Sequence, residues 1–228
     1  MSAVKRALII GASRGLGLGL VQRLKEDGWA VIATVRDTGK ADALRAVTGV
    51  QVEQLDMDDA QSVEALHTRL HDQVFDLLFV NAGVKGPDNQ IPGAAPAQEV
   101  AQLFLTNSVA PISLAQRFTH NLRPDTGVLA FMSSGLGSIS SPDAPELTLY
   151  KASKAALNSL TNTYVSQLGE RKLTVLSLHP GWVKTDMGGE DAQIDVATST
   201  RGLVDVINAY TGKGGHYFLD YQGDTIAW

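Results

Sequence analysis

Short runs of apolar residues recur along the chain, and segments with helical spacing separate them. Most of the runs are nearly continuous and do not alternate in polarity, as expected for strands of a parallel sheet that helices cover on both faces. The runs that predict strands are residues 7–10, 30–35, 50–55, 74–80, 127–132 and 173–178.

The intervening segments carry apolar residues three and four positions apart, which predicts helices. In one of them Val63, Leu66 and Leu70 share a face. The segments that predict helices are residues 20–28, 41–47, 63–70, 98–122 and 149–169. Alternation of strands and helices predicts an α/β fold, a doubly wound parallel sheet with helices on both faces. We expect about seven strands in a single Rossmann-like domain over residues 1–228, because no repeat or linker divides the chain.

Two glycine- and proline-containing stretches predict loops, residues 84–97 and the region that follows Pro180. Both come after predicted strands. In open α/β sheets ligands bind outside the carboxyl ends of the strands, so these loops are candidate walls of a site.

Composition narrows the function. The 228 residues carry a formal net charge of -5, and no basic cluster exceeds a pair, so we expect neither a nucleic-acid nor an anionic-membrane partner. Cysteine is absent, which excludes disulfides, thiol catalysis and thiolate metal sites. No apolar run approaches the roughly 20 residues of a membrane span, and no secretory leader is evident. We therefore expect a cytoplasmic protein.

A glycine-rich turn, IIGASRGLGLG, follows the first predicted strand and opens the first helix. Its glycines Gly11, Gly15 and Gly17 have the spacing GxxxGxG, which is neither GxGxxG nor a P-loop. Bare backbone at a helix N-terminus favours a pyrophosphate. The turn therefore predicts a dinucleotide site, with a purely structural turn as the alternative.

The residues after the second predicted strand should select the cofactor. An acid there binds a free ribose 2′-hydroxyl, whereas an arginine binds a 2′-phosphate. Arg36 stands directly before Asp37, and Arg14 lies in the glycine turn. Two arginines favour NADP(H), and Asp37 keeps NAD(H) as the alternative.

Tyr150 and Lys154 lie four positions apart in TLYKASKAAL, on one face of a predicted helix. Lowering a tyrosine pKa from about 10 to about 7 needs about 4 kcal/mol. A cation about 4 Å away at an effective dielectric near 20 supplies about that much. The pair is therefore energetically capable of acid–base chemistry near neutral pH. A helix can also carry YxxxK by chance, and these two residues alone favour a pair of surface side chains.

Other signals are weaker. His67 and His71 have the spacing of metal-binding helices, but no third ligand is apparent, so we predict no metal site. His179, beside Pro180, is interpreted as structural. The absence of GxSxG argues against a hydrolase nucleophile elbow.

The ordered set GxxxGxG, NAG at 81–83, Asn107, the serine pair 133–134, YxxxK at 150–154 and PG at 180–181 resembles the short-chain dehydrogenase/reductase family over essentially the whole chain. SSGLGSI, LHPGWVKTDMGG and FLDYQGDTIAW resemble its C-factor-like and sniffer-type carbonyl reductases. Ile10, Val80 and the 16-residue interval from Ser134 to Tyr150 depart from the usual pattern.

The resemblance implies an NADP(H)-dependent reductase of a ketone, aldehyde or quinone. Tyr150 would donate the proton, and Ser134, chosen over Ser133, would hold the carbonyl oxygen. Lys154 would lower the tyrosine pKa and bind the ribose. Asn107 would hold a water molecule that relays protons. The implied cofactor-binding residues are Gly11, Ser13, Arg14, Gly15, Leu16, Gly17, Arg36, Asp56, Met57, Asn81, Ala82, Gly83, Tyr150, Lys154, Pro180, Gly181, Val183 and Thr185.

Assembly and substrate follow less directly. The resemblance implies a homodimer, with a tetramer as the alternative, packed through helices 98–122 and 149–169. A second hypothesis is an NAD(P)-binding signalling or sensory protein of the C-factor type, with little catalytic role. The sequence does not identify the small-molecule carbonyl substrate or the direction of the reaction.

Overall fold

Seven parallel strands form one sheet in the computed structural model, which describes residues 3–141, 144–169 and 171–228. The strand order is β3-β2-β1-β4-β5-β6-β7, which confirms the predicted doubly wound sheet. The strands are β1 (Arg6–Ile10), β2 (Ala30–Val35), β3 (Val50–Gln54), β4 (Leu77–Val80), β5 (Val128–Met132), β6 (Thr174–His179) and β7 (Gly215–Asp220).

Six strands coincide with the apolar runs of the sequence, although β4 begins three residues later than its run. The edge strand β7 follows no such run. It contains Gly215, His216 and Tyr217, and its fully buried residues are Phe218 and Leu219. Because an edge strand pairs on one side alone, it needs less apolar surface than its neighbours.

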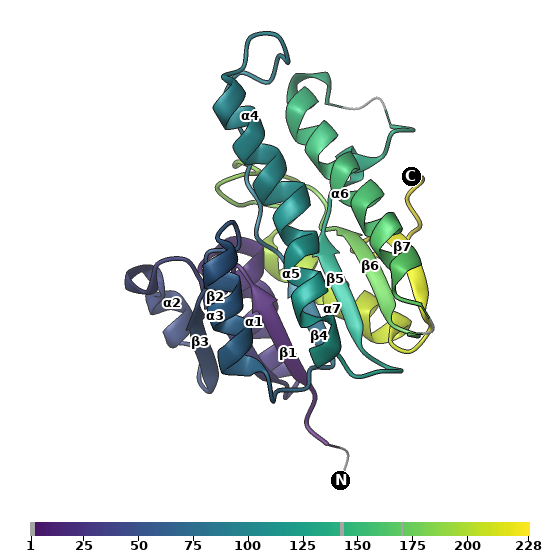
Figure 1. The fold of residues 1–228 in the computed structure, drawn as a ribbon. Helices are drawn as coiled ribbons and strands as arrows, with labels where there is room; N and C mark the ends of the chain where they lie inside the picture. Colours follow the sequence, from purple (N-terminus) through teal and green to yellow (C-terminus); the bar gives the residue numbers. More distant parts are fainter. Residues whose placement is uncertain (1–2, 142–143, 170) are drawn as a thin grey trace.

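Helices cover both faces of the sheet, and each face has its own apolar core. On one face α1 (Gly15–Glu26) packs with α7 (Val196–Tyr210). On the other lie α3 (Ala60–Leu70), α5 (Ala110–Phe118) and α6 (Thr148–Gln167), side by side in the front layer of Figure 1. The short α2 (Asp42–Arg45) lies between β2 and β3.

The region that follows Pro180 is a loop up to Asp195, as predicted, but the helix α7 that follows it was not predicted. The side chain of Asp195 accepts a hydrogen bond of 2.7 Å from the backbone N–H of Thr198 and so caps the helix. Leu203, Val204 and Ile207 then enter the core beside α1.

The predicted helix 98–122 is interrupted. It divides into α4 (Ala97–Phe104), a π-helical turn (Leu105–Val109), α5 and a 3₁₀ turn (Thr119–Asn121). Pro111 has no N–H to donate to the carbonyl of Asn107, four residues earlier, so the α-helical ladder cannot continue there. In Figure 1 α4 and the first turns of α6 extend beyond the carboxyl ends of the strands.

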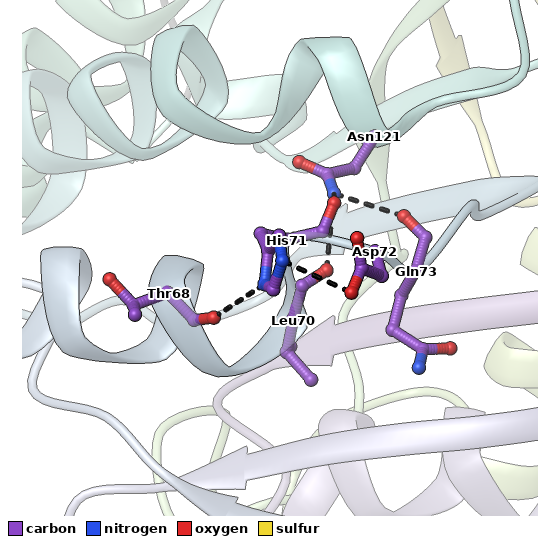
Figure 2. A network of polar contacts seen from close by, with 6 residues as sticks. All are labelled: Thr68, Leu70, His71, Asp72, Gln73 and Asn121. Carbon is purple, nitrogen blue, oxygen red and sulfur yellow. Dashed lines mark hydrogen bonds and ion pairs between the residues drawn. The ribbon is translucent and has the colours of Figure 1, made fainter.

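Asn121 holds the chain reversal between α3 and β4 (Figure 2). Its side-chain amide donates to the carbonyls of Leu70 at 3.2 Å, His71 at 3.2 Å and Gln73 at 2.9 Å. The His71 ring lies 2.9 Å from the Thr68 carbonyl and 3.0 Å from the Asp72 carboxylate. Buried Asn121 thus satisfies carbonyls that the end of a helix leaves without partners.

No helix within the described ranges combines the length and the apolar character that a membrane crossing requires. Over the same ranges, no three His, Cys, Asp or Glu side chains gather as a metal site would need. His71 bonds within its own turn, and the His67 ring packs edge-on against Phe118.

We expect Asn121→Ala to lower the free energy of unfolding by about 2 kcal/mol, because it leaves buried carbonyls unsatisfied. Urea denaturation measures the loss. Asn208→Ala is the matched control, since that exposed amide makes one bond, to Lys5, and its loss should stay within about 0.5 kcal/mol. Equal losses in the two variants would contradict the interpretation.

Candidate active site

A cleft of about 1390 Å³ lies at the carboxyl edge of the sheet. Residues predicted to be catalytic and residues predicted to bind the cofactor both line it. Of the predicted site residues, those in its lining are Gly11, Ser13, Arg14, Gly15, Leu16, Arg36, Asp56, Met57, Asn81, Ala82, Gly83, Ser134, Tyr150, Lys154, Pro180, Gly181, Val183 and Thr185. The fold therefore brings together residues that lie as far as 174 positions apart. Gly17 and Asn107 are outside the lining.

The glycine turn is packed against the end of β4. Gly11 has φ +83°, and a Cβ there would lie 2.8 Å from the Cβ of Ala82. The Asn81 amide donates to the Gly11 carbonyl at 2.7 Å. A Cβ on Gly17 would lie 2.1 Å from that same carbonyl. Gly17 thus permits the turn to close beneath the cleft, and does not line the cleft itself.

The turn fits the pyrophosphate of a dinucleotide. Helix α1 starts at Gly15, its N-cap residue Arg14 makes no side-chain cap, and no acidic residue stands in its first turn. Free backbone N–H groups and the helix dipole favour an anion at such an end. Ser13 and Leu16 complete this part of the lining.

The two residues that should select the cofactor differ in position. Arg36 follows β2, is exposed and lines the cleft. Asp37 lies outside the lining, and its carboxylate caps the 3₁₀ turn Thr38–Lys40 by accepting from the Gly39 N–H at 2.8 Å. Arg14 forms an ion pair with Asp186 across the cleft. Of these two arginines, Arg36 is the one that no ion pair engages within the described part of the chain.

Ser134 and Tyr150 meet in the cleft. A hydrogen bond joins their side chains, and both residues line the cavity. The neighbouring Ser133 instead donates to Asn158 at 2.7 Å in the interior. The two serines are distinguished by their partners, and Ser134 is the one whose hydroxyl lies beside the tyrosine.

Lys154 lies deep beneath Tyr150. Its ammonium donates to the Met132 carbonyl at 2.8 Å and lies 5.8 Å from the centroid of the tyrosine ring. Burial lowers the pKa of Lys154 to about 8. The group is therefore still mainly a cation at neutral pH.

The expected net lowering of the tyrosine pKa is not met in this structure, because burial outweighs the effect of the Lys154 cation, which favours the charged phenol from 5.8 Å beneath the ring. Burial of the hydroxyl raises the pKa of Tyr150 to about 12, and the hydrogen bond from Ser134 opposes that rise. The effect of the cation is the smaller one since the ammonium bonds to a carbonyl and not to the phenol. Tyr150 holds its proton at neutral pH, which is the state of a proton donor.

Gln90 positions the start of α6, and nothing in the sequence pattern indicated it. Its buried side chain accepts from the Tyr150 backbone N–H at 2.9 Å. Its amide donates to the carbonyls of Lys85 at 3.2 Å and Pro87 at 2.7 Å. Because α6 has no side-chain cap of its own, Gln90 supplies one from 60 residues away and ties the loop 84–96 to the tyrosine.

Asn107 lies behind the cleft, fully buried in the π-helical turn. Its side-chain oxygen accepts from the Val84 N–H at 2.8 Å, and its amide donates to the Val84 carbonyl at 2.8 Å and to Ser153 at 3.0 Å. The side chain is thus committed to joining the end of β4 to α6. Gly83 lies between it and Lys154, since a Cβ there would be 3.3 Å from the Asn107 oxygen and 3.4 Å from the Lys154 ammonium.

Loops after β3 and β6 close the remaining sides. Asp56 and Met57 line the cleft after β3, and the Asp56 carboxylate accepts from the Asp58 N–H at 3.1 Å. After β6, the Thr185 hydroxyl accepts from the Gly188 N–H at 3.1 Å, and the Trp182 indole donates to the Gly188 carbonyl at 2.8 Å. This loop is folded by its own hydrogen bonds.

Comparison with known families gives one model that covers most of the chain. Residues 5–194 match the model described as short chain dehydrogenase. Among curated proteins, the chain is similar to "C-signal" of Myxococcus xanthus, with 33% identity over 156 residues, covering 67% of this chain and 92% of that protein.

Solved structures give the same picture. A carbonyl reductase from Pseudomonas aeruginosa PAO1 in complex with NADP superposes with a TM-score of 0.92 and 36% identity, covering 99% of this chain and 100% of that one. Carbonyl reductase Sniffer of D. melanogaster gives a TM-score of 0.86 and 32% identity, covering 99% and 100%. The resemblance stated from the sequence motifs is confirmed.

Proposed function

The chain belongs to the short-chain dehydrogenase family, and on that premise we propose that it reduces the carbonyl group of a ketone, aldehyde or quinone with NADPH as the source of hydride. The observation that carries the proposal is the placement of Tyr150 beside Ser134 and above Lys154, in a cleft that the glycine turn also lines.

The residues of the cleft take distinct roles in this proposal. Ser134 hydrogen-bonds the carbonyl oxygen and holds it beside Tyr150. Tyr150 gives its proton to that oxygen, which becomes the hydroxyl of the product. The charge left on the phenol is stabilised by the Lys154 cation beneath it. Gln90 and Asn107 act through these residues, by fixing the start of α6 and the wall beside Lys154.

The glycine turn, the Asn81–Gly83 segment and the loop Pro180–Thr185 would hold the cofactor, with Lys154 and Tyr150 at its ribose. We propose NADP(H) over NAD(H) because Arg36 lines the cleft while the carboxylate of Asp37 caps a turn outside it. The Pseudomonas reductase that resembles this chain was solved in complex with NADP, which supports the same choice.

The sensory alternative draws on the similarity to C-signal. It would require a site that binds the nucleotide and does not need Tyr150 as a proton donor. The described cleft holds Ser134, Tyr150 and Lys154 together, so the enzyme is the function we propose.

A homodimer is proposed from the outer face of the helices. Leu105 and Val109 of the π-helical turn and Leu160 of α6 are exposed apolar side chains on helices that pack against each other. Covering such a patch with a second copy removes apolar surface from water.

Tyr150→Phe should reduce NADPH-dependent turnover of aromatic ketones, aldehydes and quinones by at least about 100-fold, because the proton donor is lost. NADPH absorbance measures it. Tyr164→Phe is the matched control: Tyr164 lies on the same helix, but its hydroxyl bonds to Thr119 in the core, so turnover should persist. Full retention of turnover by Tyr150→Phe would contradict the mechanism. NADPH binding without turnover in the wild type would favour the sensory alternative.

Arg36→Ala should raise the KM for NADPH by about tenfold and leave the KM for NADH nearly unchanged, since one charge-assisted contact to the 2′-phosphate is removed. Steady-state kinetics with both nucleotides measures the change. Lys40→Ala removes an exposed cation of the same segment that does not line the cleft, and it should alter neither value. Parallel changes for the two nucleotides would refute the assignment of Arg36.

Light scattering at micromolar concentration should give twice the chain mass of 24.3 kDa. Val109→Lys combined with Leu160→Glu should shift the mass to that of one chain, because charges replace the apolar contact. Val74→Lys, an exposed apolar residue elsewhere, serves as the control. A monomeric wild type would defeat the dimer.

A further inference from the structure

Three adjacent strands end side by side at the inner part of the cleft. In the register of the sheet Met132 of β5 faces Leu178 of β6, and His179 faces Asp220 of β7. Ser134 follows β5 by two residues. Because neighbours in register point to the same face of a sheet, His179 and Asp220 lie together, and both line the cleft with Ser134.

The His179 ring lies against the loop that carries the serine. A Cβ on Gly135 would lie 3.2 Å from Cδ2 and 3.3 Å from Nε2 of the ring. A larger residue at position 135 would crowd the histidine ring, so glycine lets the ring lie this close. The imidazole therefore lies beside Gly135, the residue that follows Ser134.

The ring nitrogens of His179 make no hydrogen bond to the described residues. Its Nδ1 is buried without a hydrogen-bond partner among the described residues. No ring hydrogen bond to His179 occurs within those ranges, whereas the Nε2 of His216 on the next strand lies 3.0 Å from Ser177. A ligand in the cleft cannot reach an atom that is closed to solvent. The ring nitrogen that can donate to a ligand is therefore Nε2, which is not buried in this way and has no hydrogen-bond partner within the same ranges.

Asp220 is held in place by its own turn. One oxygen of its carboxylate accepts from the Gln222 N–H at 2.8 Å and the Asp224 N–H at 2.9 Å. Burial lowers the pKa of His179, and Asp220 opposes that effect. The imidazole is thus neutral at pH 7, with one N–H to donate.

The cleft that His179 and Asp220 line also has apolar side chains, beside polar ones such as Glu146 and Lys184. Leu136, Leu147, Trp182, Met187 and Ile226 line the same cleft, and Trp182 and Met187 are 49% and 46% exposed. A mainly apolar pocket with a few convergent polar groups is the usual form of a small-molecule site.

We propose that His179 and Asp220 form a second recognition point, which binds a neutral oxygen on the carbon next to the carbonyl that is reduced. The proposal rests on the proposed function and names its substrate class: vicinal dicarbonyls and α-hydroxy ketones with an apolar substituent. His179 donates to the second oxygen, and Asp220 accepts from it when it is a hydroxyl. The carboxylate of Asp220 disfavours keto acids by repulsion.

Ligand binding tests the recognition point without turnover. Calorimetry on the full chain, loaded with NADPH so that the alcohols find no hydride acceptor, compares 1-phenyl-1,2-propanediol with 1-phenyl-1-propanol. His179→Phe should raise the Kd of the diol about tenfold and leave the mono-alcohol within twofold, as expected for one lost hydrogen bond. His179→Gln, which keeps a donor, should recover most of the affinity. His216→Phe is the matched control and should change neither Kd, because His216 lies outside the lining.

Kinetics separates this proposal from the reductase assignment. With NADPH, the ratio of kcat/KM for 1-phenyl-1,2-propanedione to that for 1-phenyl-1-propanone should fall about tenfold in His179→Phe. Comparing ratios between proteins cancels the greater intrinsic reactivity of the dione. An unchanged ratio, or equal weakening of the diol and the mono-alcohol, overturns the recognition point. Diol discrimination that depends on His179 in a protein without carbonyl turnover supports the recognition point and overturns the reductase.

Discussion

The parallel pairing of seven strands is the constraint on which the site depends. Every strand ends at the same edge of the sheet, so the residue that follows each strand faces the same volume. Gly11 follows β1, Arg36 follows β2, Asn81 follows β4 and Ser134 follows β5 closely. Covering both faces with helices then leaves this edge as the place where polar groups can meet a ligand. Motifs that are distant in the sequence line one cleft because the strands that precede them are parallel.

Burial and charge compete within that cleft. The rise of the Tyr150 pKa by about two units corresponds to about 3 kcal/mol in favour of the neutral phenol. The same desolvation lowers the pKa of Lys154. Opposite charges would stabilise each other if the ammonium reached the hydroxyl, but it bonds to the Met132 carbonyl. The resting site therefore stores a proton on the tyrosine, and a charge that appears during reaction finds a cation already in place beneath the ring.

Most strands and the glycine turn could be predicted from the sequence because their signals are local. A run of apolar residues predicts a buried strand, and a glycine-rich segment before a helix predicts a phosphate-binding turn. Three features could not be predicted from the sequence. The strand β7 has a short apolar core, the π-helical turn arises from Pro111 within a helix-like pattern, and Gln90 acts on Tyr150 from 60 residues away. The last contact has no local signature at all, since only the folded loop brings the two residues together.

Ser134 and His179 illustrate a further limit. The choice between Ser133 and Ser134 rested on spacing, whereas the structure separates them by partners, Asn158 for one and Tyr150 for the other. His179 was interpreted as structural because its neighbours resemble the cofactor loop of the family. Its ring packs on Gly135, and one buried nitrogen lacks a partner among the described residues. In the recognition point that we propose, a residue beside a cofactor motif faces the substrate, because a strand end can present its backbone to one ligand and its side chain to another.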